Sequence, residues 1–300
     1  MKRLLVSILY LASMLSAFAI GNKTIEDALK DYAVGKDARI GIAVIINGND
    51  TVSVNGERDF PMMSVSKFPL ALTIAHWIDA HGMSLNDSIT FSEAALHENT
   101  YSPMLKKYGK SRNIMSIREL LEWSLVDSDN NAADILLNHI GGTSGATSIM
   151  RQIGLSDDIV IGASEDDMHR DPYLSYLNRT TPLAMAQLFD RFDTEMRNTS
   201  LSYSEIATML EQCRTGIDRL VAPLLSSDAT IGHKTGTGFP TPDGRISAIN
   251  DCGYVNLPNG KRYSIAVFVA DSGYDMAETS AIIAEISRIV WIGLTEHKKD

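Results

Sequence analysis

The stretch Ser64-Val65-Ser66-Lys67 stands directly before an apolar run, Phe68–Ala80, that ends near Gly82. Apolar residues recur in this run at helical spacing, so it predicts a buried helix with Ser64 at its first turn. A serine and a lysine three residues apart share one helix face, beneath the positive end of the helix dipole. A neighbouring amine can activate a serine hydroxyl as a nucleophile without a histidine. A capping serine and a surface lysine are the alternative, which this stretch alone leaves open.

The chain begins with features of an export signal. Lys2 and Arg3 precede the apolar segment Leu4–Leu15, and Ala17-Phe18-Ala19 is a small-x-small site. This pattern predicts a signal peptide over residues 1–19 and a secreted, periplasmic protein. No later segment approaches the roughly 18–20 consecutive apolar residues of a membrane-spanning helix, so we expect no membrane span.

Composition limits the classes of partner. The chain has 300 residues, of which 44% are hydrophobic and 21% charged, and its net charge is −10. Such a chain can bury a large core, and the negative charge argues against nucleic acid or an anionic membrane as partner. No apolar stripe is left over once the core is assigned, so we expect a monomer. Cys213 and Cys252 are expected to be free thiols packed as small hydrophobic groups.

Patterns of strand and helix divide the chain into three segments. Strand patterns near both ends cover Arg39–Ile46 and Thr51–Val54 around an Asn47-Gly48 turn, Thr230–Lys234, Arg245–Val255 and Tyr263–Ala270. Helix patterns cover Lys23–Ala33, a helix opened by a capping box at Ser116 and running to Val126, Asn131–His139 before Gly141-Gly142, Thr181–Met196, a helix capped by Ser202 and running to Cys213, and Asp275–Leu294.

This order predicts an α/β (α+β) fold. The terminal strands would form one antiparallel sheet covered by the first and last helices, and the helical middle would be an inserted all-α domain. We place the α/β domain at residues 20–60 plus 214–300 and the all-α domain at residues 61–213. A ligand cleft is expected where the two domains meet.

Three further stretches carry residues suited to catalysis. Ser128-Asp129-Asn130 lies in a polar loop, and Lys234-Thr235-Gly236-Thr237-Gly238 ends a strand pattern rich in β-branched residues. Glu165 lies in the acidic stretch Ala163–Asn178, which has little periodicity. A long irregular loop in a compact domain is usually functional. Taken singly, the Ser128 stretch is also typical of a plain turn, and the Lys234 stretch is also typical of a strand that exits into a glycine turn.

Together, the motifs S-x-x-K, S-D-N and K-T-G in this order mark class A β-lactamases and penicillin-binding proteins. The chain resembles a class A serine β-lactamase over nearly all of its length after residue 19. Within that family it is most similar to the cephalosporinase and extended-spectrum branch of Bacteroides, because of His169, Asn178 and His233. The resemblance implies the serine β-lactamase and penicillin-binding-protein transpeptidase-like fold.

The resemblance also implies catalytic roles. Ser64 would attack the β-lactam carbonyl, and its N–H, with that of Thr237, would form an oxyanion hole. Lys67 would orient Ser64 and share its proton, and Ser128 would pass a proton to the leaving nitrogen. Glu165 would direct the water that hydrolyses the acyl-enzyme. Whether Lys67 or Glu165 is the base for acylation stays open.

Substrate-binding roles follow in the same way. Lys234, Thr235, Gly236 and Thr237 would face the substrate carboxylate, and Asn130 would hold the acylamide side chain.

Arg219 would be a second carboxylate-binding residue, with Arg245 as its competitor, and Tyr101 would stand at the cleft entrance. His169 is a further candidate for substrate contact. The alternative interpretation is a solvated surface arginine for Arg219 and a core or surface tyrosine for Tyr101.

The stretch Glu165-Asp166-Asp167-Met168-His169 departs from the family pattern Glu-Pro-x-Leu-Asn, and Asn178 replaces the aspartate that closes the loop. We expect a re-routed loop with room for bulky cephalosporin side chains. No cofactor or metal site is expected, because His76 and His81 are five residues apart and the usual zinc and nucleotide motifs do not occur.

The predicted function is therefore hydrolysis of the β-lactam amide of cephalosporins and penicillins, which confers antibiotic resistance. The alternatives are a D,D-peptidase of the penicillin-binding class and a non-enzymatic sensor that stays acylated.

Overall fold

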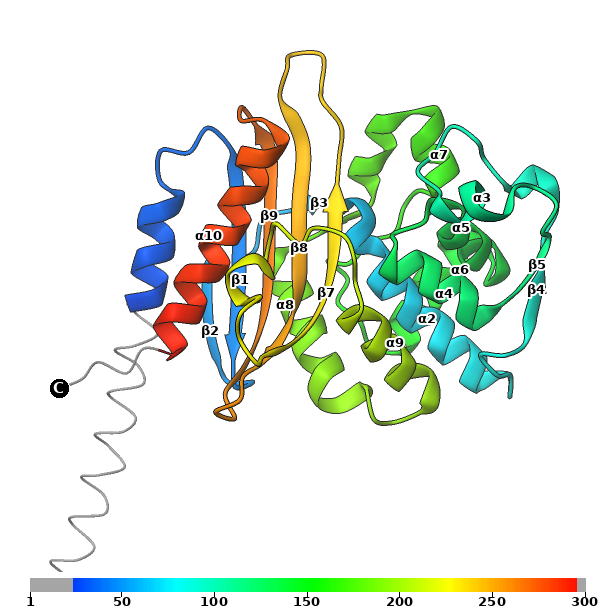
Figure 1. Ribbon diagram of the computed structural model, residues 1–300, viewed down its shortest axis with the longest axis horizontal. Coiled ribbons are helices and arrows are strands. Elements are labelled where there is room, and N and C mark those ends of the chain that lie inside the picture. The colour runs from blue at the N-terminus through cyan, green and yellow to red at the C-terminus, as the bar shows by residue number, and fades with distance from the viewer. Residues whose placement is uncertain (1–23, 296–300) are drawn as a thin grey trace, which may run out of the picture.

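The computed structural model describes residues 24–295, so the predicted signal peptide lies outside the described residues. A twisted sheet stands between two groups of helices (Figure 1). The first helix (residues 24–33) and the last, α10 (Met276–Thr295), lie together on one side of the sheet, and most other helices lie beyond its opposite edge and face (Figure 1). The two ends of the chain therefore build and cover the sheet, as predicted.

The main sheet has the strand order β2 (Asp50–Val54), β1 (Arg39–Ile46), β9 (Arg262–Ser272), β8 (Ile246–Asn256) and β7 (Thr230–Thr237). All neighbouring strands are antiparallel. The predicted hairpin is confirmed, with Val44 opposite Val52 and positive φ angles of 51° at Asn47 and 78° at Gly48. β7 forms one edge of this sheet, so its K-T-G residues face the helical part of the molecule.

Successive side chains of each strand point to opposite faces of the sheet. Two hydrophobic clusters therefore form, one on each face. Ile42, Val44 and Ile46 of β1 join the cluster formed with the first helix and α10. Ala43 and Ile45 of the same strand point the other way, into the larger cluster formed with the middle of the chain. The sheet thus contributes to both clusters and joins the two groups of helices.

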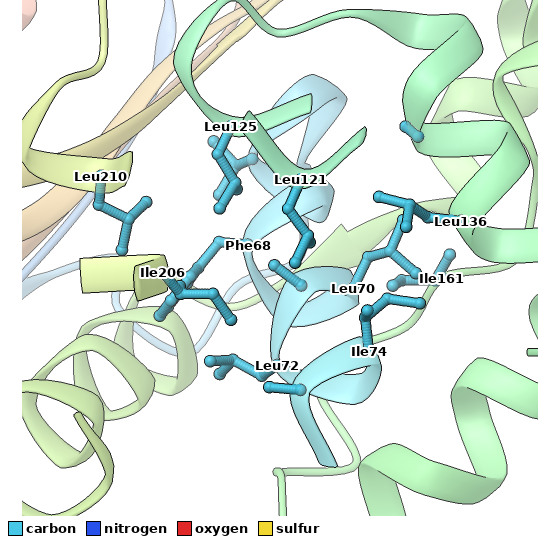
Figure 2. Packing of buried hydrophobic residues seen from close by; sticks show 14 of the residues in the cluster. Phe68, Leu70, Leu72, Ile74, Leu121, Leu125, Leu136, Ile161, Ile206 and Leu210 are labelled. Atoms are coloured by element: carbon cyan, nitrogen blue, oxygen red, sulfur yellow. The ribbon is translucent and has the colours of Figure 1, made fainter. Parts of the chain in front are cut away.

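The helical part is assembled around α2 (Lys67–Ala80), which is apolar on almost all sides and therefore buried (Figure 2). Phe68 stacks on Phe189 at 4.0 Å between ring centroids and meets Phe192 edge-on at 5.3 Å. The α-helices around it are α3 (Pro103–Tyr108), α4 (Ile117–Val126), α5 (Asn130–His139), α6 (Gly142–Gln152), α7 (Glu165–Arg170), α8 (Pro182–Arg191) and α9 (Leu201–Glu211).

Short elements complete the chain. Two small ladders pair β3 (Phe60–Pro61) with β6 (Arg179–Thr180) and β4 (Ser88–Thr90) with β5 (Ile114–Ser116). Short helical turns are η1 (Met63–Ser66), η2 (Glu93–Ala95), η3 (Pro172–Leu177), η4 (Phe192–Met196) and η5 (Ala222–Leu224). Among residues 24–295, no helix is long and apolar enough to cross a membrane.

The structure corrects three details of the predicted helices. The helix predicted before Gly141-Gly142 does end at His139, but Gly142 also begins α6, which the sequence did not predict. Positive φ angles at Gly141 and Gly142 turn the chain sharply between the two helices. The cap of α9 is Ser200, whose side chain accepts from the N–H of Tyr203, and not Ser202. The helix that begins at Pro182 ends at Arg191 and continues as the wider turn η4.

Candidate active site

Ser64 and Lys67 lie where η1 passes into α2. Ser64 belongs to η1, so it precedes α2 instead of lying in its first turn. Lys67 opens α2, is 1% exposed, and donates from Nζ to Ser64 Oγ at 3.0 Å. The residue before Ser64, Met63, has a φ of 49°, a strained conformation for a side chain of this size. The predicted hydroxyl–amine pair is therefore present on a locally strained turn.

The amine of Lys67 brings together groups from three parts of the chain. It donates to the carbonyl oxygen of Ser128 at 2.8 Å and to Oδ1 of Asn130 at 2.5 Å. It also pairs with Oε1 of Glu165 at 3.0 Å. With Ser64, Lys67 thus has four acceptors for the three N–H groups of an ammonium. Lys67 is therefore the common partner of the nucleophile, the S-D-N loop and the Glu165 carboxylate.

Ser128 connects this group to β7. It lies between α4 and α5 with a φ of 60°, and Asp129 after it caps α5 by accepting from the N–H of Ala132. Lys234 is fully buried and donates from Nζ to Ser128 Oγ at 2.9 Å. Burial, helped by the nearby charge of Lys67, lowers the pKa of Lys234 to about 8. A lysine in this state can both hold and return a proton at the Ser128 hydroxyl.

Glu165 does not lie in an irregular loop, as the sequence had indicated, but begins α7. Ser164 caps this helix in a capping box with Asp167. Asp134 of α5 accepts from the N–H groups of Glu165 at 2.7 Å and Asp166 at 2.8 Å. Burial and the charge of Glu165 raise the pKa of Asp134 to about 7, against the effect of these two bonds.

Sequence reasoning did not single out Asp134. One signal was available: Asp134 lies on the otherwise apolar face of the predicted helix Asn131–His139. A carboxylate buried on such a face needs hydrogen-bond donors, so its position indicates a specific contact.

Asn178 holds the other end of the same segment. Its side chain is buried, accepts from the N–H groups of Gly162 at 2.8 Å and Ala163 at 2.9 Å, and donates to the carbonyl of Ala163 at 3.0 Å. An amide therefore closes the base of the segment through backbone bonds. His169 is exposed in the last turn of α7 and is not among the side chains that hydrogen-bond to Ser64, Lys67 or Glu165 in the described chain.

A small cavity of about 20 Å³ lies between α2, α5 and the segment that carries α7. Its polar lining includes Lys67, Asp134, Glu165 and Asn178. A space of this size holds one water molecule, and the lining offers it several hydrogen-bond partners.

Arg219 lies beside the K-T-G motif. Its guanidinium is 7% exposed and donates to the carbonyls of Gly236 at 3.0 Å and Asn250 at 3.1 Å, and to Thr237 Oγ1 at 2.7 Å. Burial lowers the pKa of Arg219 from its usual value. Arg245 points elsewhere and pairs with Asp37 at 2.6 Å. Of the two candidates, only Arg219 is next to β7.

Close packing holds β7 against the turn that carries Ser64. A Cβ on Gly236 would lie 2.4 Å from the carbonyl oxygen of Met62, so glycine is required at this position. Asn250 of β8 donates to the carbonyls of Pro61 at 2.8 Å and Met62 at 3.1 Å. Gly236 and Asn250 thus hold the K-T-G strand directly against the residues that precede Ser64.

Tyr101 is 58% exposed, and its carbonyl accepts from the N–H of Asn130 at 3.1 Å. The aromatic ring therefore stands at the surface next to the S-D-N loop. Within residues 24–295, no three or more histidine, cysteine, aspartate or glutamate side chains are arranged to hold a metal ion.

Comparison with known proteins gives consistent matches. The beta-lactamase enzyme family matches residues 22–294. A β-lactamase of Phocaeicola vulgatus is 35% identical over 266 residues, which are 88% of this chain and 83% of that protein. The β-lactamase VEB-1 of Pseudomonas aeruginosa is 35% identical over 89% of this chain and 88% of its own length.

Solved structures agree with the sequence matches. The TLA-3 extended-spectrum β-lactamase superposes with a TM-score of 0.87 and 33% identity, over 92% of this chain and 100% of that one. A class A β-lactamase from Bacteroides cellulosilyticus gives 0.85 and 34%, over 91% and 98%. The resemblance predicted from the motifs is confirmed, and the chain belongs to the beta-lactamase enzyme family, with the fold of its class A members.

Proposed function

We propose that the protein hydrolyses β-lactams through an acyl-enzyme formed on Ser64. The observation that carries this proposal is the position of Lys67 Nζ, within 3.0 Å of both Ser64 Oγ and Glu165 Oε1. A nucleophile, an amine and a carboxylate are thus joined in one hydrogen-bonded group, as nucleophilic catalysis requires. The family and the names of its relatives, β-lactamases and extended-spectrum β-lactamases, supply the substrate class.

Acylation begins with attack of Ser64 Oγ on the lactam carbonyl carbon. The proton of Ser64 is taken by the Lys67–Glu165 pair, and a charged Lys67 can accept it only after passing one of its own protons to Glu165. The N–H groups of Ser64 and Thr237 stabilise the oxyanion, and such donors contribute about 3–4 kcal/mol each. Ser128, supported by Lys234, protonates the ring nitrogen as the C–N bond breaks. The Lys67–Glu165 pair then gives the proton taken from Ser64 to Ser128, which leaves Glu165 as a carboxylate for deacylation.

Substrate binding uses the edge of β7. Lys234, Thr235, Thr237 and Arg219 form a cationic and hydroxyl-bearing surface for the substrate carboxylate, with Gly236 allowing the close approach. Asn130 receives the acylamide group. Tyr101 and His169, both exposed, border the opening and contact the side chains of the drug.

Deacylation depends on Glu165. Its carboxylate takes a proton from a water molecule that attacks the ester carbonyl, and Lys67 returns the proton to Ser64 Oγ. The cavity beside Lys67 and Glu165 has room for one water on the inner side of this pair. The hydrogen bonds of Asp134 and Asn178 fix the backbone on either side of Glu165, so the carboxylate is held in place without the usual proline.

We also propose the cellular location, the oligomeric state and the domain organisation of the enzyme. A signal peptide over residues 1–19 delivers a monomer to the periplasm. The α/β domain is built from residues 20–60 plus 214–300 and the all-α domain from 61–213, with the site between them.

The test is a comparison of the parent protein with Glu165→Gln, using a chromogenic cephalosporin and intact mass. The parent should turn over the substrate, and the variant should be acylated but released far more slowly, because glutamine cannot accept the proton of water. Glu57→Gln changes an exposed carboxylate and is the matched control. A lasting adduct on the parent would instead show a D,D-peptidase or a sensor.

Substrate breadth is tested with the same enzyme. The re-routed Glu165 segment should admit bulky oxyimino-cephalosporins, and much faster hydrolysis of small penicillins would contradict this.

A further inference from the structure

A chain of polar side chains that the mechanism above does not use runs behind the K-T-G motif. Asp251 of β8 is fully buried, and its Oδ1 lies 2.9 Å from Nδ1 of His233 on β7. His233 is also buried and interacts with the thiol of Cys213, which follows α9. The pair is thus a thiol and an imidazole backed by a carboxylate. This corrects the sequence interpretation of Cys213 as a small hydrophobic group, which fits only the core residue Cys252.

The chain continues to the substrate surface. Cys213 Sγ lies 3.4 Å from Thr215 Oγ1, and Thr215 Oγ1 lies 2.5 Å from Thr235 Oγ1. Thr235 is one of the residues to which we assign the substrate carboxylate. Two hydroxyl groups therefore connect the thiol to the site.

Each hydroxyl has a single proton, so the direction of donation along the chain is coupled from end to end. When Cys213 donates to Thr215, Thr215 can donate to Thr235, and the Thr235 hydroxyl is left to donate to the carboxylate. When the sulfur stops donating, Thr215 can turn its proton toward the sulfur and accept from Thr235. Thr235 then has no proton for the substrate.

Charges around the thiol make this change accessible near neutral pH. His233, Lys234 and Arg219 are the cationic groups that interact with Cys213, and Asp251 is the anion behind His233. Burial opposes ionisation, but the nearby His233 outweighs it and lowers the pKa of Cys213 to about 7. Burial lowers and Asp251 raises the pKa of His233, with a net rise to about 10.

We propose that Cys213 and Thr215 are positioning residues that set the direction of the Thr235 hydroxyl, and that loss of one proton from the Cys213–His233 pair weakens binding of the substrate carboxylate. The inference rests on the proposed β-lactamase function. The proton goes to solvent. If His233 keeps the remaining proton, the sulfur is a thiolate and can only accept. If Cys213 keeps it, the thiol donates to the neutral imidazole of His233, so in neither case does the sulfur donate to Thr215.

The experiment measures KM against pH for a cephalosporin with its free carboxylate and for the methyl ester of that carboxylate. In the parent, the KM of the acid should rise by about tenfold from pH 6 to pH 8.5, the effect of one hydrogen bond to a charged group, with a much smaller change in kcat. The ester should show no such rise, because it offers no carboxylate to Thr235.

Cys213→Ser provides the decisive comparison. A serine hydroxyl keeps its proton over this range and can still donate to Thr215, so the KM of the acid should stay low at high pH. Lys234 also titrates in this range, and Cys213 raises its pKa, so Cys213→Ser lowers that pKa. Earlier loss of the Lys234 charge would raise the KM of the variant at high pH, which is opposite to the result expected here. Thr215→Val keeps the side-chain shape but removes the acceptor behind Thr235, so Thr235 can donate to the carboxylate at every pH and the KM of the acid should no longer rise with pH. Cys252→Ala removes a buried thiol outside the chain and should behave as the parent does.

The outcomes separate two kinds of failure. If the parent does not hydrolyse the cephalosporin, the proposed function is wrong and this inference falls with it. If the parent is active but its acid-to-ester KM ratio does not change with pH, or changes equally in Cys213→Ser, the inference alone is refuted. Should Cys213→Ser fold poorly, Thr215→Val decides: a parent-like pH profile in that variant also overturns the inference.

Discussion

Replacing Asp134 with asparagine tests how the Glu165 helix is held. The carboxylate of Asp134 accepts the N–H of Glu165 at 2.7 Å on one oxygen and the N–H of Asp166 at 2.8 Å on the other. Asparagine has one carbonyl oxygen, so one N–H would face an amide NH₂ and lose its acceptor. The pKa of Asp134 is raised to about 7, so the carboxyl is neutral at acidic pH. The expected cost there is that of one neutral hydrogen bond, about 0.5–1.5 kcal/mol.

Rising pH should reduce the stability of the parent, and this favours the Asp134→Asn variant. The pKa of Asp134 is raised by burial and by Glu165 to about 7, from an ordinary value of 3.8. Protonation is therefore favoured in the folded state, and the parent loses stability as pH rises from the ordinary aspartate range to the folded pKa. Each pH unit in this window is worth about 1.4 kcal/mol. Between about pH 5.5 and pH 7, the variant should gain about 2 kcal/mol relative to the parent.

The assay is urea unfolding of both proteins at these two pH values, with Asp158→Asn, an exposed carboxylate, as control. The control should show no comparable change with pH. A stability difference between parent and Asp134→Asn that is the same at both pH values would refute the reasoning. We also expect deacylation to slow by about tenfold, because a loss of about 1.4 kcal/mol in positioning Glu165 corresponds to that factor.

Two further predictions concern the residues that flank the site. Arg219→Ala should raise the KM for carboxylate substrates by tenfold or more and cost about 2–4 kcal/mol of stability, because buried acceptors lose their donor. Steady-state kinetics and urea unfolding measure these two effects. An equal rise in KM for Arg245→Ala would contradict the prediction. Asn178→Ala should slow turnover and expose the Glu165 segment to limited proteolysis, because the substitution removes three hydrogen bonds to the backbone. Asn138→Ala, at an exposed position, is its control, and equal cleavage rates in the two variants would count against the role of Asn178.

Most of the fold was predictable because its elements have strong periodic signals. The β-branched strand Arg39–Ile46 and its Asn47-Gly48 turn lie where the pattern placed them. The short helices α6 and α7 were missed for a physical reason. α6 opens with small and polar residues and buries only Ala146, Ile149 and Met150, and α7 buries none of its residues. The apolar repeat that identifies a helix is therefore short in α6 and absent from α7. The cap at Ser164 was the remaining signal for α7.

The candidate site was predictable where it depends on motifs and not where it depends on tertiary contacts. The structure brings Ser64, Lys67, Ser128 and Lys234 into one group, as the order of motifs suggested. The role of Asp134 requires knowing which backbone N–H groups reach it, and periodicity carries no such information. The polar surroundings of Cys213 likewise come from β7 and from the segment after α9, which meet only in the folded protein.

One helix explains how the Glu165 segment can change its sequence without losing its place. α5 begins at Asn130, which accepts from Lys67, and carries Asp134 one turn later, which holds the backbone at Glu165. A rigid helix fixes the distance between these two residues. The separation of the Lys67 amine from the start of α7 is therefore set by α5 and not by the residues that follow Glu165. The proline and asparagine of the usual family pattern can be replaced as long as Asp134 still receives two N–H groups, and this is why a change at Asp134 should disturb deacylation more than a change within the segment itself.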